Sequence, residues 1–303
     1  MGLGWVAVSK RRKNPRSAAT DAAPKREKVR DIFVARPFEG LADEPEWIAL
    51  RELVPAASAP LRLKAEIIEE YGDRPVTLST VLPMAWPAMT RADGRVFVGL
   101  QRHVQSGDVS RDLAVAILRA LRTEPGDTVS VPALPGEGPR LQDILDDGPL
   151  AIEMHEGFEY WLDAEQAGDP AVQASLERAN ASIYPTERLS AGRAAYWCRV
   201  PDKGHVRWVL PDAEDAALDA LARLSAAGEL LLGDRTKFAG MFRALGLLVP
   251  VWDIPGEPPA AEWEAPLAAF AKRYSDALAD TSPLDSAARR AKQGLVGRQL
   301  TLR

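Results

Sequence analysis

Apolar and polar residues follow the same arrangement in two places along this chain. In residues 86–101, and again in residues 196–211, short alternating stretches stand on either side of a glycine, a pattern that predicts a β-hairpin. Apolar residues at helical spacing follow each hairpin, in residues 110–123 and 213–227. The sequence therefore predicts two hairpins, each followed by a helix.

A second, shorter helix is predicted to follow in each copy. Residues 140–145 and 237–242 share the order basic, apolar, two further residues, apolar, apolar. A glycine (Gly148 or Gly246) and an apolar strand then close each copy. The shared order of elements favours an internal duplication. Identities are few and the gap is longer in the first copy, so a chance likeness of two hairpin–helix segments is the alternative.

The remaining patterns complete an α+β prediction with two related units, each a small, mainly antiparallel sheet covered by helices. Residues 31–184 form the first predicted unit, and residues 185–303 form the second with C-terminal helices. Further strands are predicted at 61–67, 76–82, 150–155, 158–162 and 247–254, and further helices at 43–54, 169–181 and 262–279. Predicted helix N-caps are Asp43, Asp108 or Ser110, Asp169 and Asp212.

Composition narrows the class of protein without indicating an activity. The apolar share of 46% and the charged share of 27% are typical of a globular protein. No apolar run is long enough to predict a membrane-spanning helix, so no membrane partner is expected. Cys198 is the only cysteine, which excludes an internal disulfide and a cysteine-cluster zinc site. The default expectation is a cytoplasmic protein, and the sequence does not indicate an oligomeric state.

Charge is divided unevenly along the chain. Residues 1–30 hold nine Lys/Arg against two acids, so their net charge is about +7 and that of the remaining residues is about −12. This segment is polar and lacks periodicity, which predicts a disordered basic arm. The apolar residues 1–7 have no predicted packing partner, and Val8 is an alternative start of the translated protein. The arm is a candidate for contact with nucleic acid, the ribosome or an acidic protein through Lys10, Arg11, Arg12, Lys13 and Arg16. A merely solubilising tail is the alternative, because no aromatic residues are interleaved with these charges.

The folded part offers one candidate ligand groove. None of the common nucleotide-binding, serine-hydrolase or zinc-protease motifs occurs in the chain, so an enzymatic role is neither indicated nor excluded. Glu153 and His155 share a face on a predicted strand, where they could contribute to a metal site or act as a base and its orienting partner. A structural role, as strand-end residues hydrogen-bonded at a turn, is the alternative. The two residues make too few ligands for a metal site, and no metal or cofactor is predicted. Tryptophan suits a groove that holds a ligand or peptide, although filling the core is the alternative role. The candidate groove residues are Trp86, Glu153, His155, Trp197, Arg199 and Trp208.

Several short motifs resemble an uncharacterised family of actinobacterial proteins over about residues 34–303. They are R-P-F-E-G-L from Arg36, L-P-M-A-W-P from Leu82, S-G-D-V-S-R-D from Ser106, H-E-G-F-E-Y-W from His155, Y-W-C from Tyr196 and V-P-V-W-D from Val249. The resemblance implies no activity. Some members of that family resemble proteins with an N-terminal SEC-C segment, a zinc-binding module also found in the SecA translocase. The arm here has no cysteine or histidine, so that zinc site does not transfer. Residues 237–255 also resemble the SseB-type domain of bacterial secretion and interaction proteins.

Two hypotheses of function follow. The first is a non-catalytic interaction or adaptor protein whose basic arm contacts nucleic acid or the ribosome. The second is an enzyme or small-ligand-binding protein that uses a Trp-rich groove near Glu153, His155 and Trp208.

Overall fold

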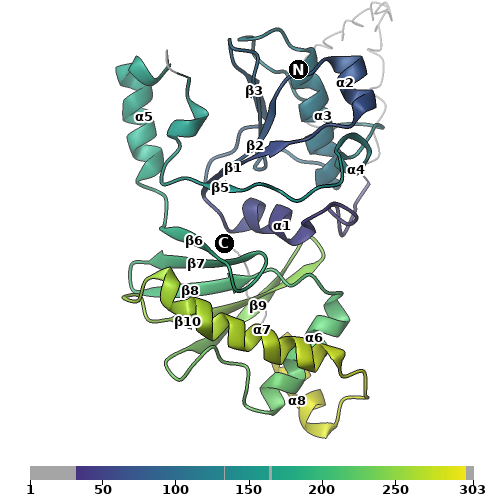
Figure 1. Ribbon diagram of the computed structural model, residues 1–303, viewed down its shortest axis with the longest axis vertical. Helices are drawn as coiled ribbons and strands as arrows, with labels where there is room; N and C mark the ends of the chain where they lie inside the picture. Colours follow the sequence, from purple (N-terminus) through teal and green to yellow (C-terminus); the bar gives the residue numbers. More distant parts are fainter. Residues whose placement is uncertain (1–31, 133, 164–165, 298–303) are drawn as a thin grey trace, which may run out of the picture. The chain divides into compact units, whose positions relative to one another are not determined.

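The computed structural model describes residues 32–132, 134–163 and 166–297. Two five-stranded, mainly antiparallel sheets and their helices make up the fold, which confirms the predicted α+β class (Figure 1). The basic arm lies outside the described residues, so its disorder and its contacts stay predictions. This applies to the candidate nucleic-acid-binding residues Lys10, Arg11, Arg12, Lys13 and Arg16.

The first sheet has the strand order β3-β4-β2-β1-β5, and β2 and β4 are its parallel pair. Its strands are β1 (Ala56–Leu61), β2 (Val76–Val81), β3 (Ala88–Thr90), β4 (Val96–Gly99) and β5 (Glu153–Met154). The helices of this part are α1 (Glu44–Glu52), α2 (Ala65–Tyr71), α3 (Val109–Arg122), α4 (Leu141–Ile144) and α5 (Pro170–Asn180), with 3-10 turns η1 (Glu159–Trp161) and η2 (Gln166–Gly168).

Helix α3 illustrates how the sequence builds this part. Leu113 and Ile117 stand four residues apart and are fully buried, as their spacing predicts. Asp108 caps the first turn by accepting the N–H of Arg111 at 3.4 Å. At the other end, the Arg74 guanidinium donates to three carbonyl oxygens of the last turn at 2.8–3.2 Å, where a cation is favoured. Both ends of the helix are therefore satisfied by side chains.

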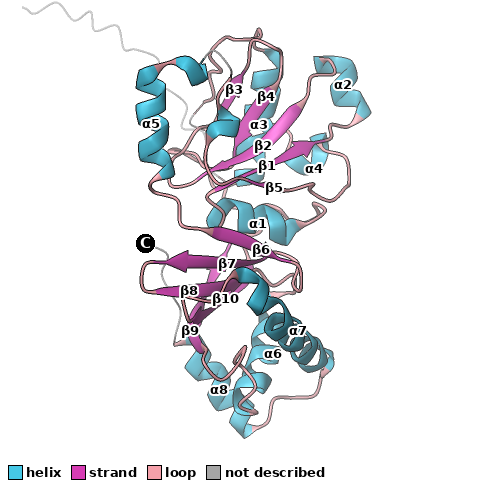
Figure 2. Ribbon diagram, turned by 60° about the vertical axis from the view of Figure 1, so that its left-hand side comes forward, coloured by secondary structure: helices cyan, strands magenta, loops and turns pink. Residues whose placement is uncertain are grey.

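The second sheet is antiparallel throughout and has the strand order β6-β7-β8-β10-β9. Its strands are β6 (Thr186–Leu189), β7 (Ala195–Val200), β8 (Lys203–Trp208), β9 (Lys237–Ala244) and β10 (Leu247–Ile254). Its helices are α6 (Glu214–Ala226), η3 (Ala260–Trp263), α7 (Glu264–Ala279) and α8 (Ser286–Val296). Figure 2 shows α6 and α7 packed together beside this sheet, and one sheet face carries Trp197, Trp208 and Trp252 into the core that they share.

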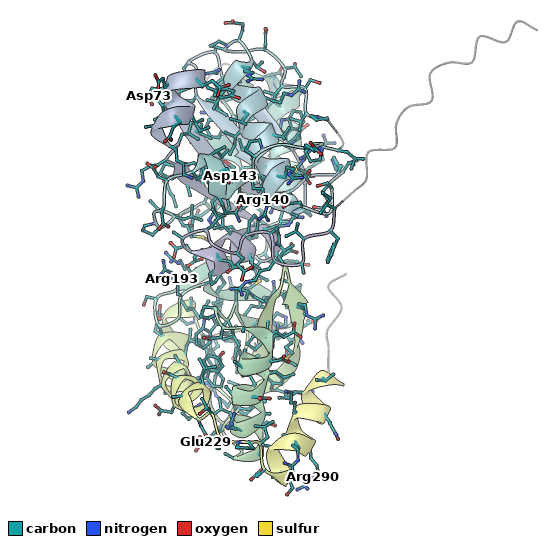
Figure 3. All side chains as sticks on the ribbon, turned by 90° about the vertical axis from the view of Figure 1, so that its right-hand side faces the viewer. Asp73, Arg140, Asp143, Arg193, Glu229 and Arg290 are labelled. Atoms are coloured by element: carbon teal, nitrogen blue, oxygen red, sulfur yellow. The ribbon has the colours of Figure 1, made fainter. Side chains whose placement is uncertain are left out.

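A buried carboxylate joins the two sheets. Glu46 on α1 is fully buried and accepts hydrogen bonds from the Arg188 guanidinium at 2.5 Å, the Ala194 N–H at 3.0 Å and the Tyr196 hydroxyl at 2.7 Å. An ion pair also joins Asp43 to Arg193, which is labelled in Figure 3.

Apolar side chains from both sheets meet at the same junction. The core cluster of the first sheet also contains Phe242, Val249 and Val251 from β9 and β10. The predicted division at residue 185 falls between α5 and β6 and stays a prediction.

The predicted helix at 237–242 is wrong, because these residues belong to β9. A register shift opposite Val251 and Trp252 marks a β-bulge near Gly240, whose φ is 142°. A bulge adds one residue to a strand, so residues three apart come to share a face. Phe238 and Met241 consequently face the same core, which imitates helical spacing in the sequence.

Two predicted strands are also wrong. Residues 61–67 comprise the end of β1 and the start of α2, and residues 158–162 form the turn η1. The N–H of Phe158 binds the Asn180 side chain at 3.0 Å instead of a neighbouring strand. A local side-chain acceptor therefore replaces the sheet ladder there.

Two of the predicted helix caps are confirmed and two are wrong. Asp108 and Asp169 cap α3 and α5 as predicted. Asp43 instead accepts the N–H of Leu150 at 2.9 Å, and Asp212 accepts the Tyr274 hydroxyl at 2.8 Å. Neither caps its helix. Asp43 has a left-handed backbone with a φ of 60°, unlike the extended backbone usual at an N-cap, and the N-cap position of α6 is occupied by Ala213, one residue after Asp212.

The internal duplication is not confirmed. Both predicted hairpins and both following helices are present. The strand orders differ, however, and the second sheet has no counterpart of the parallel β2/β4 pair. The copies also diverge after the helix, where the first continues into α4 and the second into β9.

Candidate functional site

An apolar groove lies between the loop that follows β2, the turn η1 and helix α5. Its volume is about 220 Å³. Every lining side chain except one serine is apolar: Val81, Met84, Ala85, Trp86, Phe158, Trp161, Leu162, Val172, Ser175, Leu176 and Ala179. The groove is thus suited to hold an apolar group, because burying such a group is favourable without a specific polar partner.

The loop wall displays two large apolar side chains to solvent. Met84 is 40% exposed and Trp86 is 52% exposed. Gln101 fixes both ends of the loop: its side-chain oxygen accepts the N–H of Val81 at 2.9 Å and its backbone oxygen accepts the N–H of Trp86 at 3.0 Å. A Cβ atom at Gly99 would overlap the Trp86 carbonyl oxygen, so glycine is needed for this close approach. The exposed side chains therefore stand on a fixed backbone.

The turn η1 forms the floor of the groove, and the buried guanidinium of Arg91 holds its backbone in place. The Arg91 guanidinium donates to the carbonyl oxygens of Tyr160 and Leu162 at 2.6 and 2.9 Å, and burial lowers the pKa of this arginine. It also lies 4.0 Å from the centre of the Phe97 ring, which contacts the Trp161 ring edge-on. Arg91 consequently positions the aromatic floor without entering the groove.

Helix α5 forms the third wall and none of its residues is fully buried. Val172, Leu176 and Ala179 lie at helical spacing and turn toward the groove. Asn180 fastens the end of the helix to η1 by accepting the N–H of Phe158 and donating to the Glu159 carboxylate at 2.8 Å. The apolar face of α5 is therefore half-buried: Leu176 and Ala179 pack against the cluster of Ala56, Val81 and Phe158 and also line the groove.

A histidine–serine pair lies behind the floor. The Ser58 Oγ and His155 Nε2 atoms are 2.8 Å apart, and the His155 ring stacks on Tyr160 at 4.1 Å. Burial lowers the pKa of His155, although the neighbouring Glu153 and Glu159 carboxylates oppose this shift. A neutral imidazole beside a hydroxyl has the components of a base and a nucleophile.

The six candidate groove residues are divided between the two sheets. Trp86 lines the groove, Glu153 lies on β5 and His155 reaches the groove floor through Tyr160. Trp197 and Trp208 are buried in the core under α6 and α7, and exposed Arg199 lies 5.9 Å from the Trp197 ring. The structure brings only the first three to one region.

Helix α5 and Trp161 complete the groove, and the sequence reasoning did not assign them to it. Val172, Leu176 and Ala179 have helical spacing, so the sequence contained a signal for this wall. This wall faces Trp86, which lies about 90 residues earlier in the chain, and no local sequence pattern predicts that proximity.

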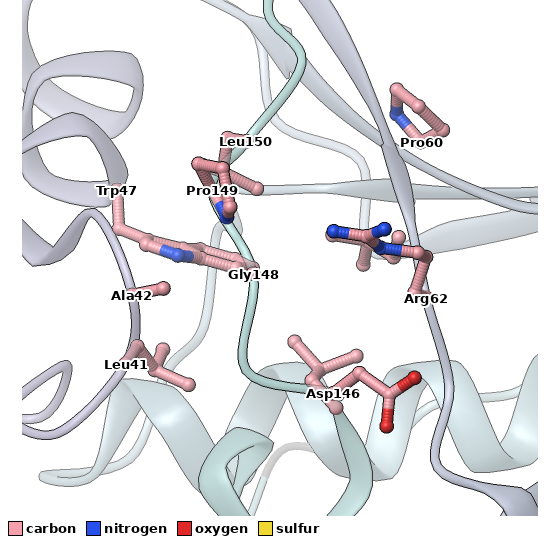
Figure 4. A pocket seen from close by; sticks show the side chains of 11 residues that line it. Leu41, Ala42, Trp47, Pro60, Arg62, Asp146, Gly148, Pro149 and Leu150 are labelled. Carbon is pink, nitrogen blue, oxygen red and sulfur yellow. The ribbon is translucent and has the colours of Figure 1, made fainter.

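The other hollows differ from the groove in size or in the polarity of their lining. A cleft of about 30 Å³ between Trp47, Arg62 and Gly148 has room for one or two water molecules (Figure 4). Larger hollows beside Arg62 and between α6 and α8 are lined partly by charged side chains. Among the described residues, no group of three or more His, Cys, Asp or Glu side chains is arranged to hold a metal ion. Within the same part of the chain, no helix is both long enough and apolar enough to cross a bilayer.

Comparison with known proteins places the chain in a family without assigning an activity. The chain belongs to a family of unknown function, DUF5926, which matches residues 37–303. No curated protein and no solved structure matches it. The groove and its surroundings are therefore the basis for any functional conclusion.

Proposed function

We propose that this protein is a cytoplasmic interaction protein that takes an apolar side chain of a partner into the groove between the 82–87 loop and α5. The observation that carries the proposal is the exposure of Met84 and Trp86 beside an apolar hollow with fixed walls. Large exposed apolar side chains that gather around a hollow are typical of interaction sites.

The size of the groove favours an anchor side chain over a whole small molecule. Sites for small molecules usually measure about 300–1,000 Å³, whereas this groove measures about 220 Å³. One or two large side chains of a partner fit that space better than a cofactor does.

Photo-cross-linking in the native cell tests this proposal. A photoreactive residue placed at Ser175, on the groove side of α5, is expected to capture the same partner as one placed at Met84. The matched controls are Leu231 and Val296, which are exposed apolar positions on the other half of the protein. Equal capture at the control positions would refute a specific groove.

The basic arm supports a second contact, with an acidic partner such as RNA or the ribosome. Its support is the concentration of nine Lys/Arg in residues 1–30. Such binding is electrostatic and falls steeply with salt. Anisotropy titrations of a labelled RNA at several salt concentrations, with and without residues 1–30, test it. Equal affinity for both chains, or no binding at low salt, would remove this part of the proposal.

The alternative function, an enzyme or small-ligand-binding protein, is favoured by the Ser58–His155 pair. Labelling by a fluorophosphonate, which reacts with activated serines, separates the two. We expect no label at Ser58 if the protein is an interaction protein. A label at Ser58 that is lost in the His155→Gln variant would favour an enzyme.

A further inference from the structure

The part of the chain that carries the floor of the groove and the α5 wall is mainly acidic. Residues 153–180 contain seven Asp/Glu, one histidine and one arginine, and the opposite wall, residues 82–90, contains no charged residue. The arginine is Arg178, which donates a hydrogen bond to the lining residue Ser175 at 3.2 Å. Arg91 does reach this region, but its guanidinium is buried against Phe97 and engaged by two carbonyl oxygens. Among the described residues of this segment, the exposed charged side chains are therefore mostly negative.

Some of these acids are neighbours of lining residues in the sequence. Glu159 stands between the lining residues Phe158 and Trp161, and its carboxylate accepts a hydrogen bond from Asn180 at the end of α5. Glu177 follows Leu176 on α5 and points about 100° away from it around the helix. Glu156, Glu159 and Glu177 are all exposed. Exposed charges act over about 10 Å at moderate salt, a range that covers the groove.

We propose that the occupant of the groove is a basic amphipathic segment of another protein, in which a large apolar anchor is flanked by Lys or Arg. This inference rests on the function proposed above and names the chemistry of its partner. The acidic rim attracts the basic flanks and accelerates their encounter with the groove. The aliphatic stems of Lys and Arg then cover apolar surface around the anchor. The half-buried apolar face of α5 is suited to such a segment, as in other grooves that receive amphipathic peptides.

The same charges disfavour anionic partners at this site. RNA and anionic lipid surfaces present phosphates, which the exposed carboxylates repel. A basic segment is the occupant that satisfies both the apolar lining and its rim.

Fluorescence anisotropy with two labelled peptides and the full-length chain tests the inference. Both peptides are 14 residues long with the same Leu and Phe anchors; one has Lys at the flanking positions and the other has Ser. We expect the Lys peptide to bind about tenfold more tightly at low salt and to lose most of this advantage at 0.5 M salt.

Charge reversal locates the effect. The double variant Glu156→Lys/Glu177→Lys is expected to weaken binding of the Lys peptide by about 5–20-fold and that of the Ser peptide by less than about twofold. The matched control, Glu229→Lys/Glu257→Lys, reverses two exposed acids of the other half and should leave both affinities within about twofold. Equal effects of the two double variants would overturn the inference.

Apolar variants separate failure of this inference from failure of the proposed function. Leu176→Asp should abolish binding of both peptides, with Met84→Ser as a second variant on an exposed side chain that folding does not need. If both peptides bind equally well and Leu176→Asp abolishes the binding of both, the groove binds peptides without preference for charge. In that case only this inference fails. If neither variant alters peptide binding, the proposed function fails as well. A labelled RNA and vesicles of phosphatidylcholine and phosphatidylglycerol are tested in the same way. If either binds the protein and Leu176→Asp abolishes that binding, the inference is overturned in favour of that ligand.

Discussion

Single buried polar residues carry much of the specificity of this fold. Glu46 satisfies three donors from the second sheet, and Gln101 holds the ends of the loop that bears Trp86. Buried polar groups of this kind are costly when a partner is removed, because the remaining groups lose their solvation without compensation. Their substitution is therefore informative.

Replacement of Glu46 by Ala is expected to lower the free energy of unfolding by about 3 kcal/mol, since it leaves Arg188, Tyr196 and the Ala194 N–H without their acceptor. Urea denaturation followed by circular dichroism measures the change. Glu229→Ala is the control, because Glu229 is exposed, and should stay within about 0.5 kcal/mol. A loss below 1 kcal/mol for Glu46→Ala would contradict the role assigned to this carboxylate.

The His155 imidazole predicts a pH dependence of stability. Burial lowers its pKa in the folded state below the value of about 6.5 for an unfolded chain. The unfolded state therefore binds the proton more readily, so the contribution of His155 to stability is complete above pH 6.5 and is lost as the pH falls toward the lower, folded pKa. NMR titration of the ring should give a pKa below 6.5, and His155→Gln should flatten the stability profile between pH 7.5 and 5.5. His205, whose pKa burial also lowers, supplies the remaining slope. A ring pKa at or above 6.5 would refute the prediction.

At the scale of elements, the groove depends on the approach of the 82–87 loop to β4. We expect Gly99→Ala to destabilise the protein by about 2 kcal/mol, because the new methyl group overlaps the Trp86 carbonyl oxygen and must displace the loop. The displacement should also weaken peptide binding in the groove. Gly138→Ala is a matched control, since a Cβ atom there meets nothing within 4 Å. Thermal denaturation of both variants measures the difference, and equal midpoints would show that the approach is not restrictive.

Local patterns were a good guide to elements whose partners are close in the chain. The spacing of Leu113 and Ile117 predicted α3, and both hairpins formed at the predicted residues. Patterns failed where long-range pairing or a local acceptor decided the structure. The bulge in β9 placed Phe238 and Met241 on one face of a strand, and Asn180 turned 158–162 away from the sheet. The groove was predictable only in part, because Trp86 and Leu176 line it from segments 90 residues apart, which no short window contains.

At the scale of the whole molecule, the two sheets depend on each other for burial. Phe242 and Val249 belong to the second sheet and are buried in the core of the first. We therefore expect urea unfolding of residues 31–303 to be a single cooperative transition by both tryptophan fluorescence and circular dichroism. Fragments 31–184 and 185–303, expressed separately, should be poorly folded and prone to aggregate, because each exposes apolar surface that the other covers. Two well-separated transitions, or a well-dispersed NMR spectrum from either fragment alone, would contradict this.

The backbone of the groove is fixed by residues that do not line it. Gln101 holds the loop and Arg91 holds the floor through main-chain atoms, so neither depends on which apolar side chains project inward. Recognition and architecture are consequently encoded at different positions. Descendants of one ancestral gene can exchange the lining, and with it the preferred anchor, while retaining the same frame. Libraries randomised at positions 84, 86 and 176 would exploit this separation to retarget the protein.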